Sequence, residues 1–352
     1  MRHDEATGTK PQYNAPVATD RAAVLGAGSW GTALAVHLGK AGHEVSLWGR
    51  DPTLVDAMAS RRVNDTYLPG VRLPDAVSPT ANVAEALTGA RFVVVAVPSQ
   101  WLRGVIREAS THLSPRSILV SATKGLENDT LMRMSEVLAM ETSGRQPVVV
   151  LSGPSFASEV ARECHTALVA ASGDAAAVSA VQEEFRAPYL RLYGSDDVVG
   201  VEIGGALKNV IAIAAGVVEG LELGHNAMAA LVTRGLAEMS RLSCAMGGRR
   251  DTMAGLSGLG DLVLTCTGSL SRNHHVGLEL GRGRTTASVV GGMKMVAEGV
   301  NTTSAALALG VRYGVELPIV AQMGEVLAGR RTPREALGCL MLRPQRVETE
   351  SD

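Results

Sequence analysis

Short apolar runs alternate with amphipathic stretches over the first half of the chain. The runs are typical of strands buried on both faces of a parallel sheet, and the stretches between them are typical of helices. The clearest strands are residues 91–98, 117–121 and 147–151, and edge strands are expected at 165–171 and 189–193. This alternation predicts an α/β fold with a Rossmann-type, mostly parallel sheet.

The second half of the chain has a different pattern. Beyond about Tyr193 the strand signals nearly vanish, and long helices rich in Ala, Gly and Leu are separated by glycine-rich loops. We therefore expect a dinucleotide-binding domain at residues 21–193 and an all-α substrate and catalytic domain at 194–342. Residues 1–20 lack periodicity and the apolar core of a signal peptide, which predicts a disordered tail. Residues 343–352 are expected to be frayed.

A glycine-rich turn joins the first expected strand to the first expected helix. The segment 21–35 places Gly26, Gly28 and Gly31 in the G-x-G-x-x-G spacing. In such a site the first glycine makes the tight turn, the second lets the backbone approach a pyrophosphate, and the third lets the helix pack closely on its strand. The helix N-terminus then offers free N–H groups to the anion. The segment therefore predicts a dinucleotide site.

The end of the second expected strand, residues 42–48, indicates which dinucleotide is bound. A carboxylate about 20 residues beyond the glycines usually holds the ribose 2′-hydroxyl of NAD. A guanidinium instead matches the 2′-phosphate of NADP in charge and shape. Here Arg50 follows the strand and Asp51 comes one residue later. Arg50 favours NADP(H), and Asp51 leaves NAD(H) open.

One lysine of the second half lies in apolar surroundings. Its helical neighbours, three and four positions away, include no carboxylate; around Lys208 they are Gly204, Gly205, Ile211 and Ala212. Burial disfavours the charged form and lowers the pKa, which makes Lys208 a candidate proton donor to a carbonyl. A lysine whose ammonium group reaches the surface is the alternative interpretation. The two glycines, which leave room beside Lys208, favour the functional one.

A glycine-rich loop further along carries a second set of polar residues. Residues 255–267 contain Asp261, which can accept from hydroxyl groups, and Ser271, Arg272 and Asn273 follow. An arginine beside an asparagine can hold a phosphate. A flexible loop with a helix N-cap at Ser271 explains the same pattern equally well.

Composition argues against several other classes of function. A net charge of −2 and an aromatic content of 3% do not favour a nucleic-acid partner. The four cysteines are widely spaced, which fits a reducing cytoplasm better than a disulfide framework or a zinc site. The most apolar segment, residues 203–218, is short and contains Lys208, so no membrane span is expected. No spacing of histidines or carboxylates indicates a metal site.

Together the motifs resemble those of the bacterial NAD(P)-dependent glycerol-3-phosphate dehydrogenases, over about residues 21–340. They are Gly26-Ala27-Gly28-Ser29-Trp30-Gly31-Thr32-Ala33, Ala122-Thr123-Lys124-Gly125-Leu126, Ser152-Gly153-Pro154-Ser155-Phe156-Ala157, Gly205-Ala206-Leu207-Lys208-Asn209-Val210 and Gly258-Leu259-Gly260-Asp261-Leu262 with Ser271-Arg272-Asn273. The resemblance implies the reversible conversion of dihydroxyacetone phosphate and NAD(P)H to sn-glycerol 3-phosphate, for glycerophospholipid synthesis in the cytoplasm.

The resemblance also implies roles for individual residues. Lys208 would be the proton donor and acceptor, assisted by Lys124 and Asp261. The cofactor would be held by Gly26, Gly28, Ser29, Trp30, Gly31, Arg50, Lys124, Ala157, Arg272, Val296 and Glu298. The substrate would be held by Lys124, Gly153, Ser155, Lys208, Asp261 and Ser271, and its phosphate by Arg272 and Asn273.

The sequence leaves two other functions open. A related hydroxyacid or ketopantoate-type reductase would share the strand–helix plan, but its substrate would carry a carboxylate in place of the phosphate. An NADP(H)-sensing module would bind the cofactor without turnover, and Lys208 and Lys124 would then be structural. A substrate panel separates the first alternative, and a test for ketone-dependent cofactor oxidation separates the second. Apolar faces in the helical domain predict a homodimer.

Overall fold

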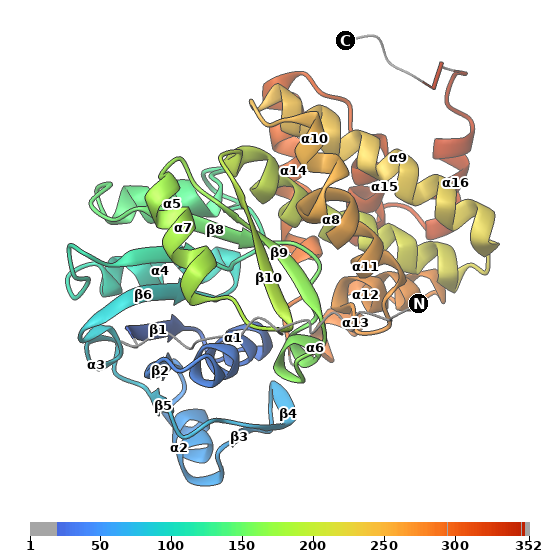
Figure 1. Ribbon diagram of the computed structural model, residues 1–352. Helices are drawn as coiled ribbons and strands as arrows, with labels where there is room; N and C mark the ends of the chain where they lie inside the picture. The colour runs from blue at the N-terminus through green and yellow to red at the C-terminus, as the bar shows by residue number, and fades with distance from the viewer. Residues whose placement is uncertain (1–19, 294, 346, 349–352) are drawn as a thin grey trace, which may run out of the picture.

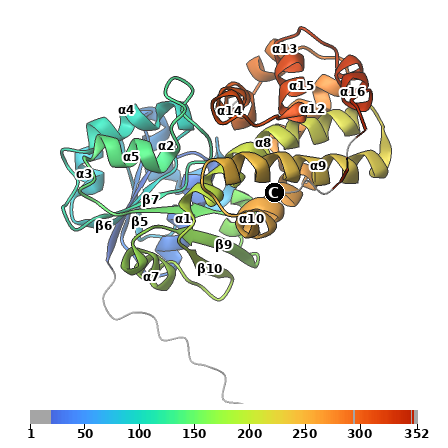
Figure 2. The same ribbon diagram turned by 90° about the horizontal axis from the view of Figure 1, so that it is seen from above.

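The computed structural model describes residues 20–293, 295–345 and 347–348. The expected disordered tail, residues 1–20, lies outside the described residues except for Asp20, and so does part of the expected frayed end. Figure 1 shows a half built on a β-sheet beside an all-helical half, and Figure 2 shows the same two halves from above.

The sheet half is built on eight strands in the order β10-β9-β8-β7-β6-β1-β2-β5. The strands are β1 (Arg21–Leu25), β2 (Val45–Trp48), β5 (Val77–Thr80), β6 (Ala90–Val95), β7 (Ile118–Ser121), β8 (Val148–Ser152), β9 (Thr166–Ala171) and β10 (Leu190–Ser195). Neighbouring strands pair in parallel except β8 and β9, which are antiparallel. The predicted Rossmann-type, mostly parallel sheet is therefore confirmed.

The edges of the sheet differ in part from the prediction. β10 is an edge strand as expected, but β9 lies inside the sheet between β10 and β8. The opposite edge is β5, which the apolar pattern does not reveal because its sequence is Val77-Ser78-Pro79-Thr80. Proline is tolerated there because an edge strand does not need every N–H group for pairing. A short hairpin of β3 (Val63–Asn64) and β4 (Leu68–Arg72) follows α2.

Helices cover both faces of the main sheet. Along β1, Ala22 and Val24 lie in one apolar core while Ala23 and Leu25 lie in the other, because successive side chains point to opposite faces. The first core includes α1 (Ser29–Lys40), α2 (Pro52–Arg61) and α7 (Ala175–Glu184). The second includes α3 (Val83–Leu87), α4 (Ser99–Ala109) and α5 (Met134–Glu141). The short α6 (Ala157–Ala161) follows β8.

The helical half is built around α8 (Val198–Gly220). By length and composition α8 could cross a membrane, yet 89% of its most apolar window is buried inside the structure. It is the central helix of an apolar core. The elements that follow it are α9 (Gly224–Ala245), α10 (Arg250–Ala254), the π-helix η1 (Leu256–Gly260), α11 (Asp261–Thr267), α12 (Arg272–Gly281), α13 (Thr286–Gly291), α14 (Glu298–Tyr313), α15 (Pro318–Leu327) and α16 (Pro333–Met341).

α8 and α12 cross almost backbone to backbone. A Cβ added at Gly216 would lie 2.0 Å from the carbonyl oxygen of His274, and one added at Gly277 would lie 1.8 Å from that of Ile213. Any side chain at either glycine would push the two helices apart. The crossing therefore fixes α12 against the C-terminal half of α8.

Two glutamates of the helical half, the buried Glu202 and the partly buried Glu298, cap helices of the sheet half. Glu202 in α8 accepts from the N–H group and the hydroxyl of Ser135 at the start of α5, at 2.8 and 2.6 Å. Glu298 at the start of α14 accepts from the N–H group and the hydroxyl of Ser99 at the start of α4, at 3.0 and 2.7 Å. Each carboxylate satisfies a donor that the first turn of a helix leaves without an intrahelical partner. These two caps hold the halves together.

We expect Glu202→Ala to lower the free energy of unfolding by about 3 kcal/mol, the usual effect of removing one partner of a buried ion pair. Arg133, which pairs with Glu202 at 2.7 Å, would stay buried with its charge less well compensated. The control is Glu136→Ala, because Glu136 pairs with the same arginine at 2.7 Å but is more exposed. This change should cost about 1 kcal/mol. Urea unfolding measures both, and equal losses would contradict the capping role of Glu202.

Candidate active site

Two ammonium groups and one carboxylate meet at the boundary between the halves. Asp261, the first residue of α11, accepts from Lys208 Nζ through Oδ1 and from Lys124 Nζ through Oδ2, each at 2.6 Å. Lys208 comes from α8, and Lys124 from the loop after β7. Asp261 is fully buried and Lys208 is 6% exposed, so a single carboxylate compensates two charges that have little access to water.

Two glycines of α8 allow this cluster to form. A Cβ added at Gly204 would lie 2.6 Å from the carbonyl oxygen of Ser257, and one added at Gly205 would lie 2.8 Å from Ser152 Oγ. The sequence predicts open space at these glycines beside Lys208, but Ser257 and Ser152 occupy that space. The glycines let η1 and the end of β8 approach α8, and η1 leads directly into Asp261.

The environment of Lys208 makes it more acidic than an ordinary lysine. Burial and, to a smaller extent, the charge of Lys124 lower its pKa from the usual 10.5 to about 8, although Asp261 acts in the opposite direction. The direction agrees with the expectation from the apolar sequence around Lys208. At neutral pH the ammonium form dominates and can still give up its proton near the working pH.

The sequence does not single out Thr265, which completes the surroundings of Lys208. Its hydroxyl accepts from Lys208 Nζ at 2.8 Å and donates to the carbonyl oxygen of Asp261 at 2.6 Å. Thr265 lies one helical turn after Asp261, so the two side chains share a face of α11. The spacing of four residues from Asp261 is the signal that could have identified Thr265 in the sequence.

The glycine-rich turn has the shape that a pyrophosphate requires. Gly26 has a φ of +118°, and a Cβ added at Gly31 would lie 1.9 Å from the carbonyl oxygen of Gly26. A Cβ added at Gly28 would meet nothing within 4 Å, so the space beside this residue is open. The bond from Thr32 N–H to the Gly28 carbonyl leaves the N–H groups of Ser29–Gly31 for an anion. The turn therefore fits a dinucleotide.

Side chains beside the turn fit the same ligand. Trp30 in α1 has a buried Nε1 with no hydrogen-bond partner among the described residues. Arg50 is exposed just after β2. The carboxylate of Asp51 accepts from the N–H group of Thr53 at 2.9 Å and caps α2. Capping accounts for Asp51, which leaves Arg50 as the better candidate for the adenosine ribose.

Gly153 and Ser155 lie in the loop after β8, beside Lys124. The carbonyl oxygen of Gly153 accepts from Lys124 Nζ at 2.9 Å and from the hydroxyl of Ser155 at 3.1 Å. Ala157 is the first residue of α6, directly after this loop. The structure thus brings three of the expected binding residues to one loop and ties that loop to the lysine cluster.

The start of α12 carries the three residues expected at the substrate phosphate. Ser271 is the N-cap of this helix and accepts from the N–H group of His274, as the alternative interpretation predicts. Arg272 is exposed and donates to the carbonyl oxygen of Val296 at 2.9 Å, which leaves further N–H groups for a phosphate. Asn273 is buried, and its amide is largely engaged by Asn209 and by the N–H group of Gly299.

The contact between Ser99 and Glu298 lies next to the lysine-bearing loop. A Cβ added at Gly125 would lie 2.8 Å from Ser99 Oγ and 3.2 Å from a carboxylate oxygen of Glu298. Gln100 Nε2 donates to the carbonyl oxygen of Leu126 at 2.7 Å. Burial raises the pKa of Glu298, although the bonds from Ser99 oppose this. The starts of α4 and α14 thus converge on the residue that follows Lys124.

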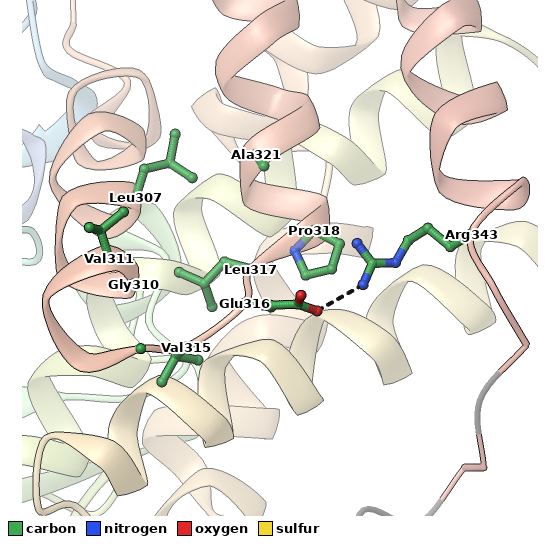
Figure 3. A pocket seen from close by; sticks show the side chains of 10 residues that line it. Leu307, Gly310, Val311, Val315, Glu316, Leu317, Pro318, Ala321 and Arg343 are labelled. Carbon is green, nitrogen blue, oxygen red and sulfur yellow. Dashed lines mark hydrogen bonds and ion pairs between the residues drawn. The ribbon is translucent and has the colours of Figure 1, made fainter.

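Figure 3 shows a separate cavity of about 410 Å³ at the turn between α14 and α15. Its lining is mostly apolar, with Leu307, Val311, Val315 and Leu317, and an ion pair of 3.0 Å joins Glu316 to Arg343 at its side. None of the expected site residues lines this cavity, so it is distinct from the candidate active site. Within the described ranges, no group of three or more His, Cys, Asp or Glu side chains could hold a metal ion.

A phosphate-binding turn in a Rossmann-type sheet, combined with a buried lysine of lowered pKa, defines a dinucleotide-dependent dehydrogenase. Family models for the N-terminus and the C-terminus of NAD-dependent glycerol-3-phosphate dehydrogenase match residues 21–178 and 197–338. The chain therefore belongs to the NAD-dependent glycerol-3-phosphate dehydrogenase family.

Individual relatives agree with this assignment. A glycerol-3-phosphate dehydrogenase (NAD(P)+) of Koribacter versatilis (strain Ellin345) is 52% identical over 332 residues, which cover 93% of this chain and 98% of the relative. The crystal structure of glycerol-3-phosphate dehydrogenase from Coxiella burnetii is 38% identical with a TM-score of 0.89, and the match covers 92% of this chain and 99% of that one. A ketopantoate reductase from Ralstonia eutropha JMP134 is 16% identical with a TM-score of 0.59 over 90% and 99% of the two chains, which shows the shared fold alone.

We expect Ser99→Ala to raise KM for the dinucleotide about tenfold, because Glu298, one of the residues expected at the cofactor, loses a charge-assisted hydrogen bond of about 1.5 kcal/mol. The matched control is Ser135→Ala, since Ser135 makes the same two contacts to Glu202. That variant should lose a similar amount of stability while KM stays near the wild-type value. Steady-state kinetics and urea unfolding of both variants give the comparison, and equal KM values for the two variants would contradict the prediction.

Proposed function

We propose that this protein catalyses the reversible reduction of dihydroxyacetone phosphate to sn-glycerol 3-phosphate, with NAD(P)H as the hydride donor. The observation that carries the proposal is the buried cluster in which Asp261 joins Lys208 to Lys124. Reduction of a ketone needs a proton donor beside the hydride donor, and Lys208 has the required lowered pKa. The choice of substrate follows from membership of the family.

Each member of the cluster has a distinct task in this reaction. Bound NAD(P)H supplies the hydride that reaches C2 of the ketone. Lys208 Nζ gives its proton to the developing alkoxide oxygen, and Asp261 and Thr265 hold Nζ in place. Lys124 keeps the Asp261 carboxylate oriented and adds positive charge near the reacting oxygen. In the reverse direction neutral Lys208 takes the proton from the alcohol.

The substrate phosphate would be held at the start of α12. Arg272 offers the charge and the N–H groups, Asn273 offers one further N–H, and Ser271 begins the helix whose N-terminus favours an anion. Gly153 and Ser155 would line the remainder of the substrate. Phosphate binding occurs away from the reacting carbon, so its binding energy can be used to orient the ketone.

The cofactor would lie along the carboxyl ends of the strands, with its pyrophosphate at the glycine turn. The contacts would come from Gly26, Gly28, Ser29, Trp30, Gly31, Arg50, Lys124, Ala157, Arg272, Val296 and Glu298. We propose a preference for NADP(H), because Arg50 is exposed after β2 while Asp51 caps α2.

The wider setting belongs to the same proposal. The product would enter glycerophospholipid synthesis in the cytoplasm. Each chain would consist of two domains, residues 21–193 and 194–342, and two such chains would form a homodimer. The ketopantoate-type alternative is less favoured, because identity is 52% to a glycerol-3-phosphate dehydrogenase and 16% to a ketopantoate reductase. A sensing module without turnover does not account for a buried lysine cluster with a titratable proton donor.

The first test follows the absorbance of NADPH, and separately of NADH, after purified protein meets dihydroxyacetone phosphate. We expect the wild type to oxidise NADPH faster, and Lys208→Ala to lower kcat by about three orders of magnitude, in keeping with loss of general acid catalysis. Cofactor affinity should stay near the wild-type value. A variant that keeps turnover within about tenfold would contradict the role of Lys208, and cofactor binding without oxidation would overturn the function.

The lowered pKa of Lys208 predicts opposite pH profiles for the two directions. Ketone reduction needs the protonated lysine, so its kcat/KM should fall as pH rises through about 8, while alcohol oxidation should rise through the same value. Lys124→Met removes a neighbouring charge that lowers the pKa of Lys208, so the residual activity should show both transitions at higher pH. Profiles without a transition in this range, or a shift to lower pH in the variant, would contradict the assignment.

A further inference from the structure

The strand order places two side chains on either side of the glycine turn. β1 lies between β2 and β6, so the segment after β2 and the segment after β6 flank the turn that follows β1. Arg50 belongs to the first segment, and Trp101 in the first turn of α4 belongs to the second. Ligands of doubly wound sheets bind in this crevice, outside the carboxyl ends of the strands.

Arg50 and Trp101 are in contact across the crevice. The guanidinium carbon of Arg50 lies 5.7 Å from the centroid of the Trp101 ring, within the range of a cation–π interaction. Throughout the described part of the chain, Arg50 has no other ion pair or hydrogen bond. The contact with Trp101 is therefore what orients this guanidinium.

The packing of α4 does not require a tryptophan at this position. Leu102 and Ile106 carry the contact of α4 with the sheet and are fully buried, whereas Trp101 is 49% exposed. An exposed indole beside a ligand crevice is therefore explained better by a contact that it makes there than by the apolar core.

We propose that Trp101 is a positioning residue that holds Arg50 for the 2′-phosphate of NADP(H) and so sets the preference over NAD(H). A guanidinium that stacks on an aromatic face keeps the N–H groups at its edge free for a bidentate contact with phosphate. NAD(H) carries a hydroxyl at this position and gains little from an oriented guanidinium. The proposal deepens the proposed function, on which it rests for the dinucleotide site.

The test compares Trp101→Leu, which removes the aromatic face, with Trp101→Phe, which keeps one. We expect Trp101→Leu to weaken NADP(H) about tenfold, both in KM and in direct equilibrium binding of NADP+, with a much smaller effect on NAD(H) and on kcat. Trp101→Phe should restore most of the lost preference. The wild-type tryptophan fluorescence should change when NADP+ binds, and this change should be smaller in Trp101→Phe.

A matched control is available at the far edge of the sheet. Tyr193 in β10 is also an exposed aromatic, and the guanidinium carbon of Arg191 lies 5.1 Å from its ring centroid. Tyr193→Leu should leave the affinities for both dinucleotides at wild-type values. In a double-mutant cycle, Trp101→Leu should add little to Arg50→Gln, because Trp101 acts through Arg50. Additive losses would show that Trp101 acts independently of Arg50 and would overturn the proposal.

The binding measurements keep the two proposals apart. Suppose that the wild type oxidises the cofactor normally and that Trp101→Leu keeps the wild-type ratio of NADP+ to NAD+ affinity. This result would overturn the role of Trp101 alone. Suppose instead that the wild type prefers NADP+ but does not reduce dihydroxyacetone phosphate, and that Trp101→Leu lacks the preference for NADP+. This result would overturn the proposed reaction alone. A wild type that binds neither dinucleotide, or both equally, would overturn the role of Trp101.

Discussion

Asp261 is a single buried carboxylate between two ammonium groups, that of the buried Lys208 and that of the partly buried Lys124, and the docking of the two halves depends on it. Lys124 is supplied by the sheet half, while Lys208 and Asp261 are supplied by two different helices of the other half. An unpaired charge in this position would be costly, so the cluster is favourable only when all three elements are in place. The caps at Ser99 and Ser135 secure that docking at two further points. The site is thus a property of the assembled boundary and of neither half alone.

The cluster also leaves the boundary with an excess of positive charge. Two ammonium groups share one carboxylate, and Arg272 stands at the start of a nearby helix in contact with α8. Such a site attracts a phosphorylated substrate, whose negative charge supplies the missing compensation. Burial is the main cause of the lowered pKa of Lys208, and the charge of Lys124 adds to it while that of Asp261 opposes it. In the proposed reaction, substrate recognition therefore depends on the net charge of the site, whereas proton donation depends mainly on the burial of Lys208.

The sequence reveals the parts of this arrangement that depend on local pattern. The strands buried on both faces, the glycine spacing and the apolar surroundings of Lys208 are all visible in short segments. The edge strand β5 is hidden because Pro79 and polar residues break its pattern. The antiparallel direction of β9 is set by its pairing with β8, which the apolar pattern of a single strand does not reveal. The pairing of Lys208 with Asp261, which are 53 residues apart, depends on the packing of two helices. The contact of Arg50 with Trp101 likewise depends on the strand order.

The two glutamate caps show how one local motif serves two purposes. Both carboxylates accept a serine N–H group and hydroxyl from a helix of the other half. Glu202 has Arg133 beside it, so its charge is compensated within the protein. Within the described residues Glu298 has no ion pair, and burial raises its pKa, although the bonds from Ser99 and the charge of Arg272 oppose this. Glu298 lies against Gly125, the residue after Lys124, whereas Glu202 lies beside Arg133. We therefore expect the Glu202 cap to be structural and the Glu298 cap to respond to the cofactor of the proposed reaction.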